Sequence, residues 1–285
     1  MPPFLKISVP SLALGFIFIL AVIVTAGVIS FITGNRSRSY RALSPFASVV
    51  ISEKSVSLDD LARSFKPELF LSPGDSSPPA LEMLWEAVDA GDSIALIYHP
   101  VWQDERHPSP ILHWIYYAYR AIVYGVPVRD IEYIQVNVSK AGGFIKKIRY
   151  EGSSSSIYNS WLVNHTMVTI EKNGDIYVET VISSGIPAHV NDVQIIGPNL
   201  GFGIESWSHQ FKLLNNNSRS KYTIPVTMPI KPLTETDYAK YKLARRSQGD
   251  FVTEDSIIGR SAKSVMGILV LGVPYIVSKF LDNGR

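Results

Sequence analysis

The sequence contains no cysteine among its 285 residues. A chain without thiols forms no disulfide scaffold, iron–sulfur cluster or thiolate zinc site, and it has no cysteine nucleophile. Charged residues are also scarce, at 18%, whereas hydrophobic residues reach 46%. This composition is too apolar for a disordered chain, and the length is sufficient for a substantial core.

The centre of the chain lacks an excess of basic residues. The formal net charge is +2, but the end segments 1–33 and 261–285 contain four of the 27 basic residues and only one of the 25 acidic residues. The chain between these segments is therefore slightly acidic. Nucleic-acid-binding proteins carry a basic patch or stripe, so we expect no nucleic-acid partner.

Common catalytic motifs are missing as well. The sequence has no GxSxG nucleophile elbow, no phosphate-binding P-loop and no HExxH zinc motif. The motifs alone therefore do not identify an enzyme, and the question of catalysis stays open.

Residues 11–33 form a run of 23 residues without a charge. A helix needs about 20 apolar residues to cross the hydrocarbon core of a bilayer, so we expect a transmembrane anchor over residues 1–33. A cleavable signal peptide that ends near Ala26 is the alternative. The apolar run is longer than the usual core of a signal peptide, which favours the anchor.

The orientation of the body relative to the membrane is indicated by two signals that disagree. Arg36, Arg38 and Arg41 follow the anchor and favour a cytoplasmic body by the positive-inside rule. Sequons for N-glycosylation favour an extracytoplasmic body. They lie at Asn35, Asn137, Asn164 and Asn216. We expect a membrane protein with a glycosylated, extracytoplasmic body.

The predicted fold class is α+β, in which an N-terminal transmembrane helix precedes an antiparallel β-sandwich with flanking helices. A juxtamembrane linker covers residues 34–55, the β-sandwich body residues 56–233, and a polar helix the segment 234–260. Residues 261–285 form an apolar helix that either spans the membrane a second time or lies on its surface. Within the body we expect helices at 58–65, 80–90 and 111–124, strands at 67–71 and 93–101, and a loop at 201–203.

The clearest local pattern is a hairpin. Residues 166–172 and 175–182 are rich in β-branched residues and flank Asn173-Gly174. This dipeptide is typical of the tight primed turns that join antiparallel strands.

Asp130 and Glu132 begin an alternating segment, so their carboxylates point to the same face if both lie in the strand. Two adjacent carboxylates repel each other unless a cation joins them. Mg²⁺ or Ca²⁺ is one such cation, with His189 as a third candidate ligand and His107 or His113 as further ones. The alternative is a solvated strand start that pairs with Arg129 or Arg120.

Three segments resemble two related groups of proteins. Residues 67–75 (PELFLSPGD), 94–99 (IALIYH) and 130–136 (DIEYIQV) are similar to the Vps62-like proteins and to the necrosis-inducing NPP1-like toxins. The toxins carry a GHRHDWE motif, of which Asp130 and Glu132 match the two acids. The resemblance covers residues 66–190. It implies a β-sandwich, a divalent metal at the acids, and lipid or surface recognition.

The leading functional hypothesis is a membrane-anchored, surface-exposed β-sandwich protein with a binding or structural role. Its partners would be the lipid bilayer and a surface glycan, lipid or protein, and a homo-oligomer is left open. One alternative is a divalent-metal-dependent hydrolase that uses Asp130 and Glu132. Another is a subunit of a membrane complex, in which Gly267 and Gly272 form helix contacts.

Overall fold

The structure is a computed structural model that describes a β-rich body. The described residues are 42–73, 79–107, 109–110, 113–114, 117–118, 129–153, 165–183, 186–193, 195, 200–204, 207, 209–214 and 219–241. The predicted anchor at 1–33, residues 34–41 of the linker, the apolar helix at 261–285 and residues 242–260 of the polar helix at 234–260 lie outside them. No helix in these ranges has the length and apolarity that a membrane span requires.

The predicted fold class is wrong, because strands and not helices build the described part of the chain. The first strands are β1 (Ser48–Ile51), β2 (Lys54–Ser57), β3 (Glu68–Leu71), β4 (Ala80–Asp89), β5 (Ser93–Trp102), β6 (Asp130–Ile131), β7 (Ile134–Ser139) and β8 (Ile145–Ser153). The later ones are β9 (His165–Asn173), β10 (Ile176–Ser183), β11 (Ile186–Val193), β12 (Gly201–Ile204), β13 (Phe211–Leu213), β14 (Ile224–Val226) and β15 (Ile230–Pro232). The helical elements among them are α2 (Leu58–Ser64), η1 (Arg219–Lys221) and α4 (Glu235–Tyr241).

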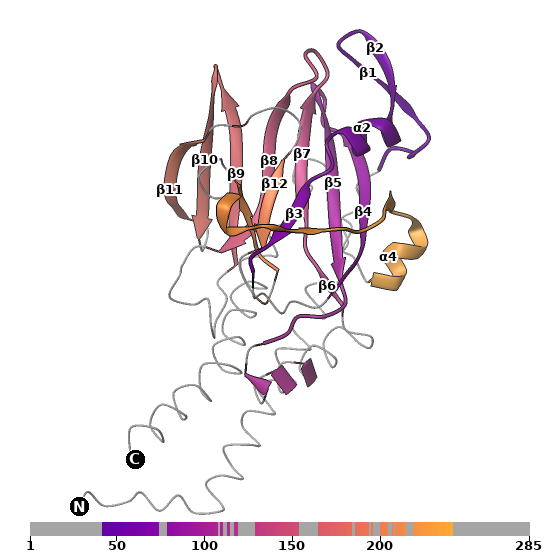
Figure 1. Cartoon of the computed structure of the whole chain (residues 1–285). Helices are drawn as coiled ribbons and strands as arrows, with labels where there is room; N and C mark the ends of the chain where they lie inside the picture. The colour runs from indigo at the N-terminus through magenta and orange to yellow at the C-terminus, as the bar shows by residue number, and fades with distance from the viewer. Residues whose placement is uncertain are drawn as a thin grey trace, which may run out of the picture.

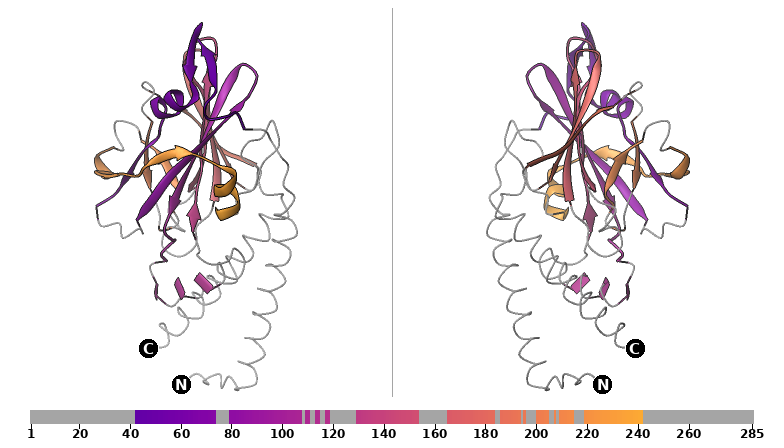
Figure 2. Two further views of the ribbon diagram at one scale, coloured as in Figure 1. Left: turned by 90° about the vertical axis from the view of Figure 1, so that its right-hand side faces the viewer. Right: turned by 90° about the vertical axis from the view of Figure 1, so that its left-hand side faces the viewer.

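All strands except β1 and β2 belong to one 13-stranded sheet (Figure 1). Its main path runs β14-β3-β12-β13-β8-β7-β5-β4-β15, and β9, β10 and β11 continue from β8 as a second branch. The pairs β3–β12, β8–β13 and β4–β15 are parallel, so the sheet is mixed and not purely antiparallel. Figure 2 shows how strongly the strands twist relative to one another.

The hydrophobic core lies on one face of the central strands. Ile134, Val136 and Val138 of β7 point into it, together with Leu96 and Tyr98 of the neighbouring β5. Helix α2 covers this face, and the hydroxyl group of Tyr98 donates a hydrogen bond of 2.8 Å to the carbonyl oxygen of Ala62. Ile94 and Trp102 of β5 belong to the same core. Because alternate residues of a strand point to opposite faces, the odd-numbered residues of β5 and β7 face away from it.

Residues 80–90 were predicted as a helix and instead form β4, which pairs with β5 over Ala80–Asp89. The six residues from Met83 to Val88 are all buried, so apolar side chains are needed on both faces of the strand. Such a strand loses the alternation that would reveal it, and its apolar residues then also match helical spacing.

The predicted loop at 201–203 is also a strand, β12, whose four residues are all buried. A Cβ atom on Gly203 would lie 2.7 Å from the ring of Tyr222. The glycine therefore permits close packing of a side chain on the strand and does not mark a turn.

Several local predictions are confirmed. Strands β9 and β10 form the predicted hairpin, although its turn consists of Gly174 and Asp175, one position later than expected. Gly174 has a φ of 60°, a conformation that glycine adopts without strain. The strand at 93–101 corresponds to β5, and the strand at 67–71 corresponds to β3.

Helix α2 is the predicted helix at 58–65, and its capping residue offers a local test of stability. The hydroxyl oxygen of Ser57 accepts a hydrogen bond from the backbone N–H of Asp60 at 3.1 Å. Replacing Ser57 with alanine leaves this N–H without its cap, so we expect a loss of about 1 kcal/mol in the free energy of unfolding. Urea unfolding measures this loss, and Ser64→Ala at the other end of the helix is the control. An equal loss in both variants would contradict the capping role.

Candidate metal centre

The end of β5 and the short strand β6 bring the acidic residues together. Trp102, the last residue of β5, pairs with Asp130 of β6. The chain then leaves the strand at Glu132, whose backbone N–H donates to the carbonyl oxygen of Pro100 at 3.3 Å. Glu105 lies in the extended segment that follows β5. The pairing of β5 with β6 thus brings Glu105, which precedes the chain between the two strands, to the same edge of the sheet as Asp130 and Glu132, which follow it.

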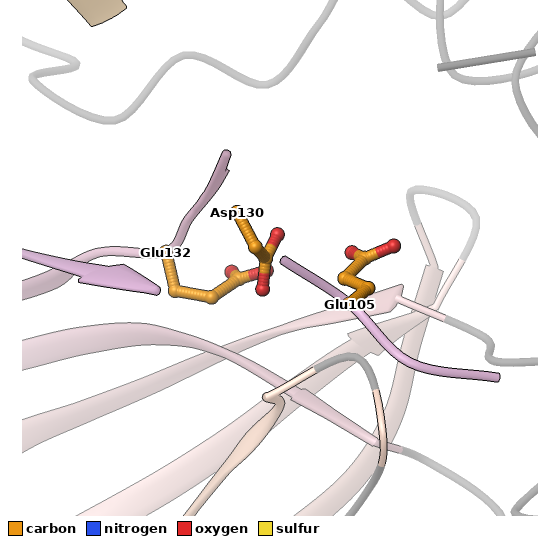
Figure 3. Close-up of side chains that lie close together, drawn as sticks. All are labelled: Glu105, Asp130 and Glu132. Atoms are coloured by element: carbon orange, nitrogen blue, oxygen red, sulfur yellow. The ribbon is translucent and has the colours of Figure 1, made fainter. Parts of the chain in front are cut away.

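Glu105, Asp130 and Glu132 form a compact acidic cluster (Figure 3). One carboxylate oxygen from each residue lies within 4.8 Å of those from the other two. Each of the three residues is only 5% exposed. Carboxylates so close together and so poorly solvated repel one another strongly unless protons or a cation neutralise them.

His209 holds one of these carboxylates in place. Its Nδ1 lies 2.6 Å from Oδ2 of Asp130, and the imidazole is fully buried. The ring stacks on the indole of Trp102, with 4.2 Å between centroids and an interplanar angle of 2°. His209 has a φ of 56°, in the left-handed region that residues other than glycine seldom adopt. The strained backbone and the stacked ring together orient the histidine toward Asp130.

Glu132 lies in surroundings that disfavour its ionised form. Burial raises the pKa of Glu132 well above its ordinary value, and the negative charges of Glu151, Asp130 and Glu105 raise it further. All of these contributions favour the protonated acid.

The residues fit a hard divalent cation. Their donors are carboxylate oxygens, which Mg²⁺ and Ca²⁺ prefer. Two oxygens that each lie about 2.4 Å from one Ca²⁺ are at most about 4.8 Å apart. The three carboxylate oxygens of the cluster lie within this distance of one another. Carboxylates that bind a metal are themselves oriented by hydrogen bonds from outer residues, and His209 is placed for that role beside Asp130.

The predicted site residues are brought together only in part. Carboxylate oxygens of Asp130 and Glu132 lie within 4.8 Å of each other, although β6 ends at Ile131 and Glu132 therefore lies outside the strand. His189 is on β11, which is separated from β8 by β9 and β10, and its side chain lies outside the described residues. His107 is buried against Trp207, with 4.8 Å between ring centroids, and His113 packs near Tyr117.

Two members of the site were missed by the sequence analysis. Glu105 belongs to a polar segment that directly follows the buried strand β5. A prediction that β5 pairs with the segment at Asp130 would have indicated that Glu105 lies near Asp130. His209 lies between β12 and β13, 79 residues from Asp130, and no sequence pattern connects the two.

The sequons fall mostly outside the described chain. Asn35, Asn164 and Asn216 are not described. Asn137 is 8% exposed on β7, and its Oδ1 accepts a hydrogen bond of 2.7 Å from Gln135. A glycosylated asparagine must be accessible to solvent, so the burial of Asn137 counts against a glycan at this position in the folded protein.

Comparison with known proteins gives distant structural similarities only. No family model matches the chain, and no curated protein matches it. A solved structure described as NLPPya in complex with mannosamine has 11% identity and a TM-score of 0.34, covering 72% of this chain and 84% of the other. Another, described as a toxin fold for microbial attack and plant defense, has 11% identity and a TM-score of 0.35, covering 72% and 85%.

Both structures are toxins of the necrosis- and ethylene-inducing type. The predicted resemblance to NPP1-like proteins therefore extends to a distant similarity of fold at most, and the resemblance to Vps62-like proteins stays a prediction. With TM-scores below 0.5, these similarities support no conclusion about the ligand or activity of this protein.

Proposed function

We propose that the protein is a β-rich binding protein whose acidic cluster, formed by Glu105, Asp130 and Glu132, binds one divalent cation, Mg²⁺ or Ca²⁺. The observation that carries the proposal is the close approach of three buried carboxylates within 4.8 Å of one another. A fourth carboxylate, Glu151, hydrogen-bonds to Glu132 and adds its charge. A divalent cation offsets this concentration of negative charge more completely than a single proton does.

The burial of the cluster favours a cation that stabilises the structure over one that catalyses hydrolysis. A catalytic metal keeps a coordination position open to water or substrate. Here the three acids are each 5% exposed and His209 is fully buried, so a substrate has little access. The cation would instead hold together β5, β6 and the segment that precedes β7. It would thereby keep this edge of the sheet in the conformation that binds a partner. The metal-dependent hydrolase is therefore the less favoured function.

Thermal unfolding of the purified full-length chain tests the proposal. After treatment with EDTA, we expect Ca²⁺ or Mg²⁺ to raise the melting temperature, because a ligand that binds only the native state stabilises it. At a cation concentration of about 100 times Kd the gain is about 2.7 kcal/mol. Isothermal titration calorimetry measures the stoichiometry, which we expect to be one ion per chain.

The double variant Asp130→Asn/Glu132→Gln keeps the size of both side chains and removes their charges. We expect it to lose the response to Ca²⁺ and Mg²⁺. Asp59→Asn/Asp60→Asn on α2 is the matched control, since it removes two neighbouring exposed or half-buried carboxylates far from the cluster in sequence. No shift with either cation, or an equal shift in the double variant, would contradict the proposal.

The partner of such a binding protein is still a matter of prediction. A surface glycan, a lipid or another protein, the formation of a homo-oligomer and an extracytoplasmic body are expectations from the sequence.

A further inference from the structure

Gln210 has a polar side chain that is buried completely. Its exposed fraction is 0%, and neither Oε1 nor Nε2 of its amide has a hydrogen-bond partner among the residues that the structure describes. An amide that loses its hydrogen bonds to water and gains none in return is unfavourable in the folded state. Such a group in a native protein calls for a physical reason, and an ion or ligand that it serves is one.

The chain places Gln210 directly after His209. Nδ1 of His209 lies 2.6 Å from Oδ2 of Asp130, and the imidazole ring stacks on Trp102. Because consecutive Cα atoms are only about 3.8 Å apart, Gln210 starts one residue from the side chain that holds an acid of the cluster.

The pairing of β13 with β8 brings Gln210 close to a second acid. Phe211, the first residue of β13, lies opposite Gly152 of β8 in a parallel pair. Gln210 and Glu151 are the residues that precede this pair, so the two lie side by side where β13 begins. Glu151 hydrogen-bonds to Glu132 of the cluster. The chain connection to His209 and the strand register therefore both place Gln210 next to the acidic cluster.

Packing alone does not account for a glutamine at this position. Phe211 belongs to the hydrophobic core, whereas the amide of Gln210 gains no hydrogen bond from its burial. An apolar residue of similar size removes the two amide atoms that lack partners, and such a replacement is neutral or stabilising. The glutamine is therefore better explained by a ligand of the folded protein than by the stability of the cation-free fold.

The surroundings of the cluster distinguish Ca²⁺ from Mg²⁺. Ca²⁺ binds about six to eight oxygen atoms, and the amide oxygen of glutamine is one of its usual ligands. Mg²⁺ gives up its water molecules reluctantly and is usually held by only one or two carboxylates. Glu105, Asp130 and Glu132 are each 5% exposed and Gln210 is not exposed at all, so the site offers little room for water. A site rich in protein oxygens and poor in water favours Ca²⁺.

We propose that Gln210 supplies a further oxygen ligand to the cation of the acidic cluster, and that the site thereby selects Ca²⁺ over Mg²⁺. Oε1 contributes directly or through one bound water, and Nε2 is then available to donate a hydrogen bond to a carboxylate. A neutral oxygen adds to the coordination without adding to the repulsion among the acids. The inference rests on the proposed cation site and names the cation that this site takes.

Calorimetric titration of the EDTA-treated and dialysed full-length chain with CaCl₂ and with MgCl₂ tests the selectivity. We expect Ca²⁺ to bind at least about tenfold more tightly than Mg²⁺. The variant Gln210→Met removes both polar atoms of the amide and nearly keeps the size of the side chain. We expect it to bind Ca²⁺ about 10–100-fold more weakly, the usual cost of losing a group that supports a metal. Its preference for Ca²⁺ over Mg²⁺ should shrink as well.

Thermal unfolding in EDTA separates this role from a structural one. Because Gln210→Met removes buried groups without partners, the variant should melt at the same temperature as the natural protein or higher. A glutamine that serves only the fold would give the reverse result, namely a lower melting temperature in EDTA and an unchanged affinity for Ca²⁺. Gln210→Glu keeps an oxygen at the same position and should restore most of the affinity for Ca²⁺.

Gln135→Met on β7 is the matched control, because Gln135 is also a buried glutamine. It lines a cavity of about 640 Å³ together with Asn137 and Arg149, and this lining contains none of the three acids. The control should bind Ca²⁺ as the natural protein does. If the natural protein binds neither cation, the cation site itself is wrong. If it binds Ca²⁺ but Gln210→Met binds it equally tightly, or Mg²⁺ binds as tightly as Ca²⁺, only the role of Gln210 is overturned.

Discussion

Replacing Trp102 with alanine should lower the free energy of unfolding by about 3–5 kcal/mol. The side chain is 1% exposed at the end of β5 and belongs to the hydrophobic core. Its removal leaves a large cavity beside the ring of His209, which stacks on the indole. The loss of this support also frees the histidine from its position beside Asp130. We therefore expect the variant to lose most of the stabilisation by Ca²⁺ or Mg²⁺ as well.

Urea unfolding followed by circular dichroism measures the effect. Trp114→Ala is the matched control, because this tryptophan is 73% exposed and its loss should change the stability by less than about 0.5 kcal/mol. Trp102→Phe keeps an aromatic ring for stacking on His209 and should recover part of the stability and of the cation response. A cost below about 1 kcal/mol for Trp102→Ala would show that the packing around this residue is not as tight as described.

Replacing Glu132 with glutamine should stabilise the cation-free protein and remove the stabilisation by cations. Burial and the neighbouring carboxylates raise the pKa of Glu132 in the folded chain. In the unfolded chain the pKa of a glutamate is about 4.3. The folded state therefore holds a proton that the unfolded state has released, and the free energy of unfolding falls as the pH rises above about 4.3. The slope is about 1.4 kcal/mol per pH unit until the pKa of the folded state is reached.

Glutamine resembles the protonated acid and does not titrate, so the variant escapes this loss. In EDTA, its advantage over the natural protein should be absent below about pH 4.3 and grow as the pH rises above it, until the pKa of Glu132 in the folded state is reached. With Ca²⁺ or Mg²⁺ present the order should reverse, because the natural protein then gains a ligand that the variant lacks. Glu68→Gln, at an exposed position of β3, is the control. A stability difference that does not depend on pH or on the cation would contradict both the proton and the cation roles of Glu132.

The elements that were predicted correctly are those with a local cause. Helix α2 begins at Ser57 because a serine side chain caps the N–H of Asp60. The β9–β10 hairpin turns at a glycine with positive φ. In both cases the residues that determine the structure are close in sequence, so a short window contains the information.

The errors share a different cause, which is burial from both sides. Strand β4 was assigned as a helix because its apolar run reflects packing on two faces. Gly203 was assigned to a loop because the ring of Tyr222, which excludes a side chain there, comes from a distant part of the chain. Strand β4 pairs with β15, which lies far from it in the sequence. Gly203 of β12 is likewise constrained by Tyr222, which lies outside the local sequence of β12.

The sequence by itself determined that this protein is a thiol-free chain without a nucleic-acid-binding charge pattern, and that Asp130 and Glu132 stand two residues apart with their carboxylates able to meet. Only the tertiary structure decided that Glu105 and His209 join them, and that Gln135, Asn137 and Arg149 line one cavity. The physical reason is the mixed sheet. Its hydrogen-bonded register joins residues that are tens of positions apart, and no periodicity in the sequence records which strands will become neighbours.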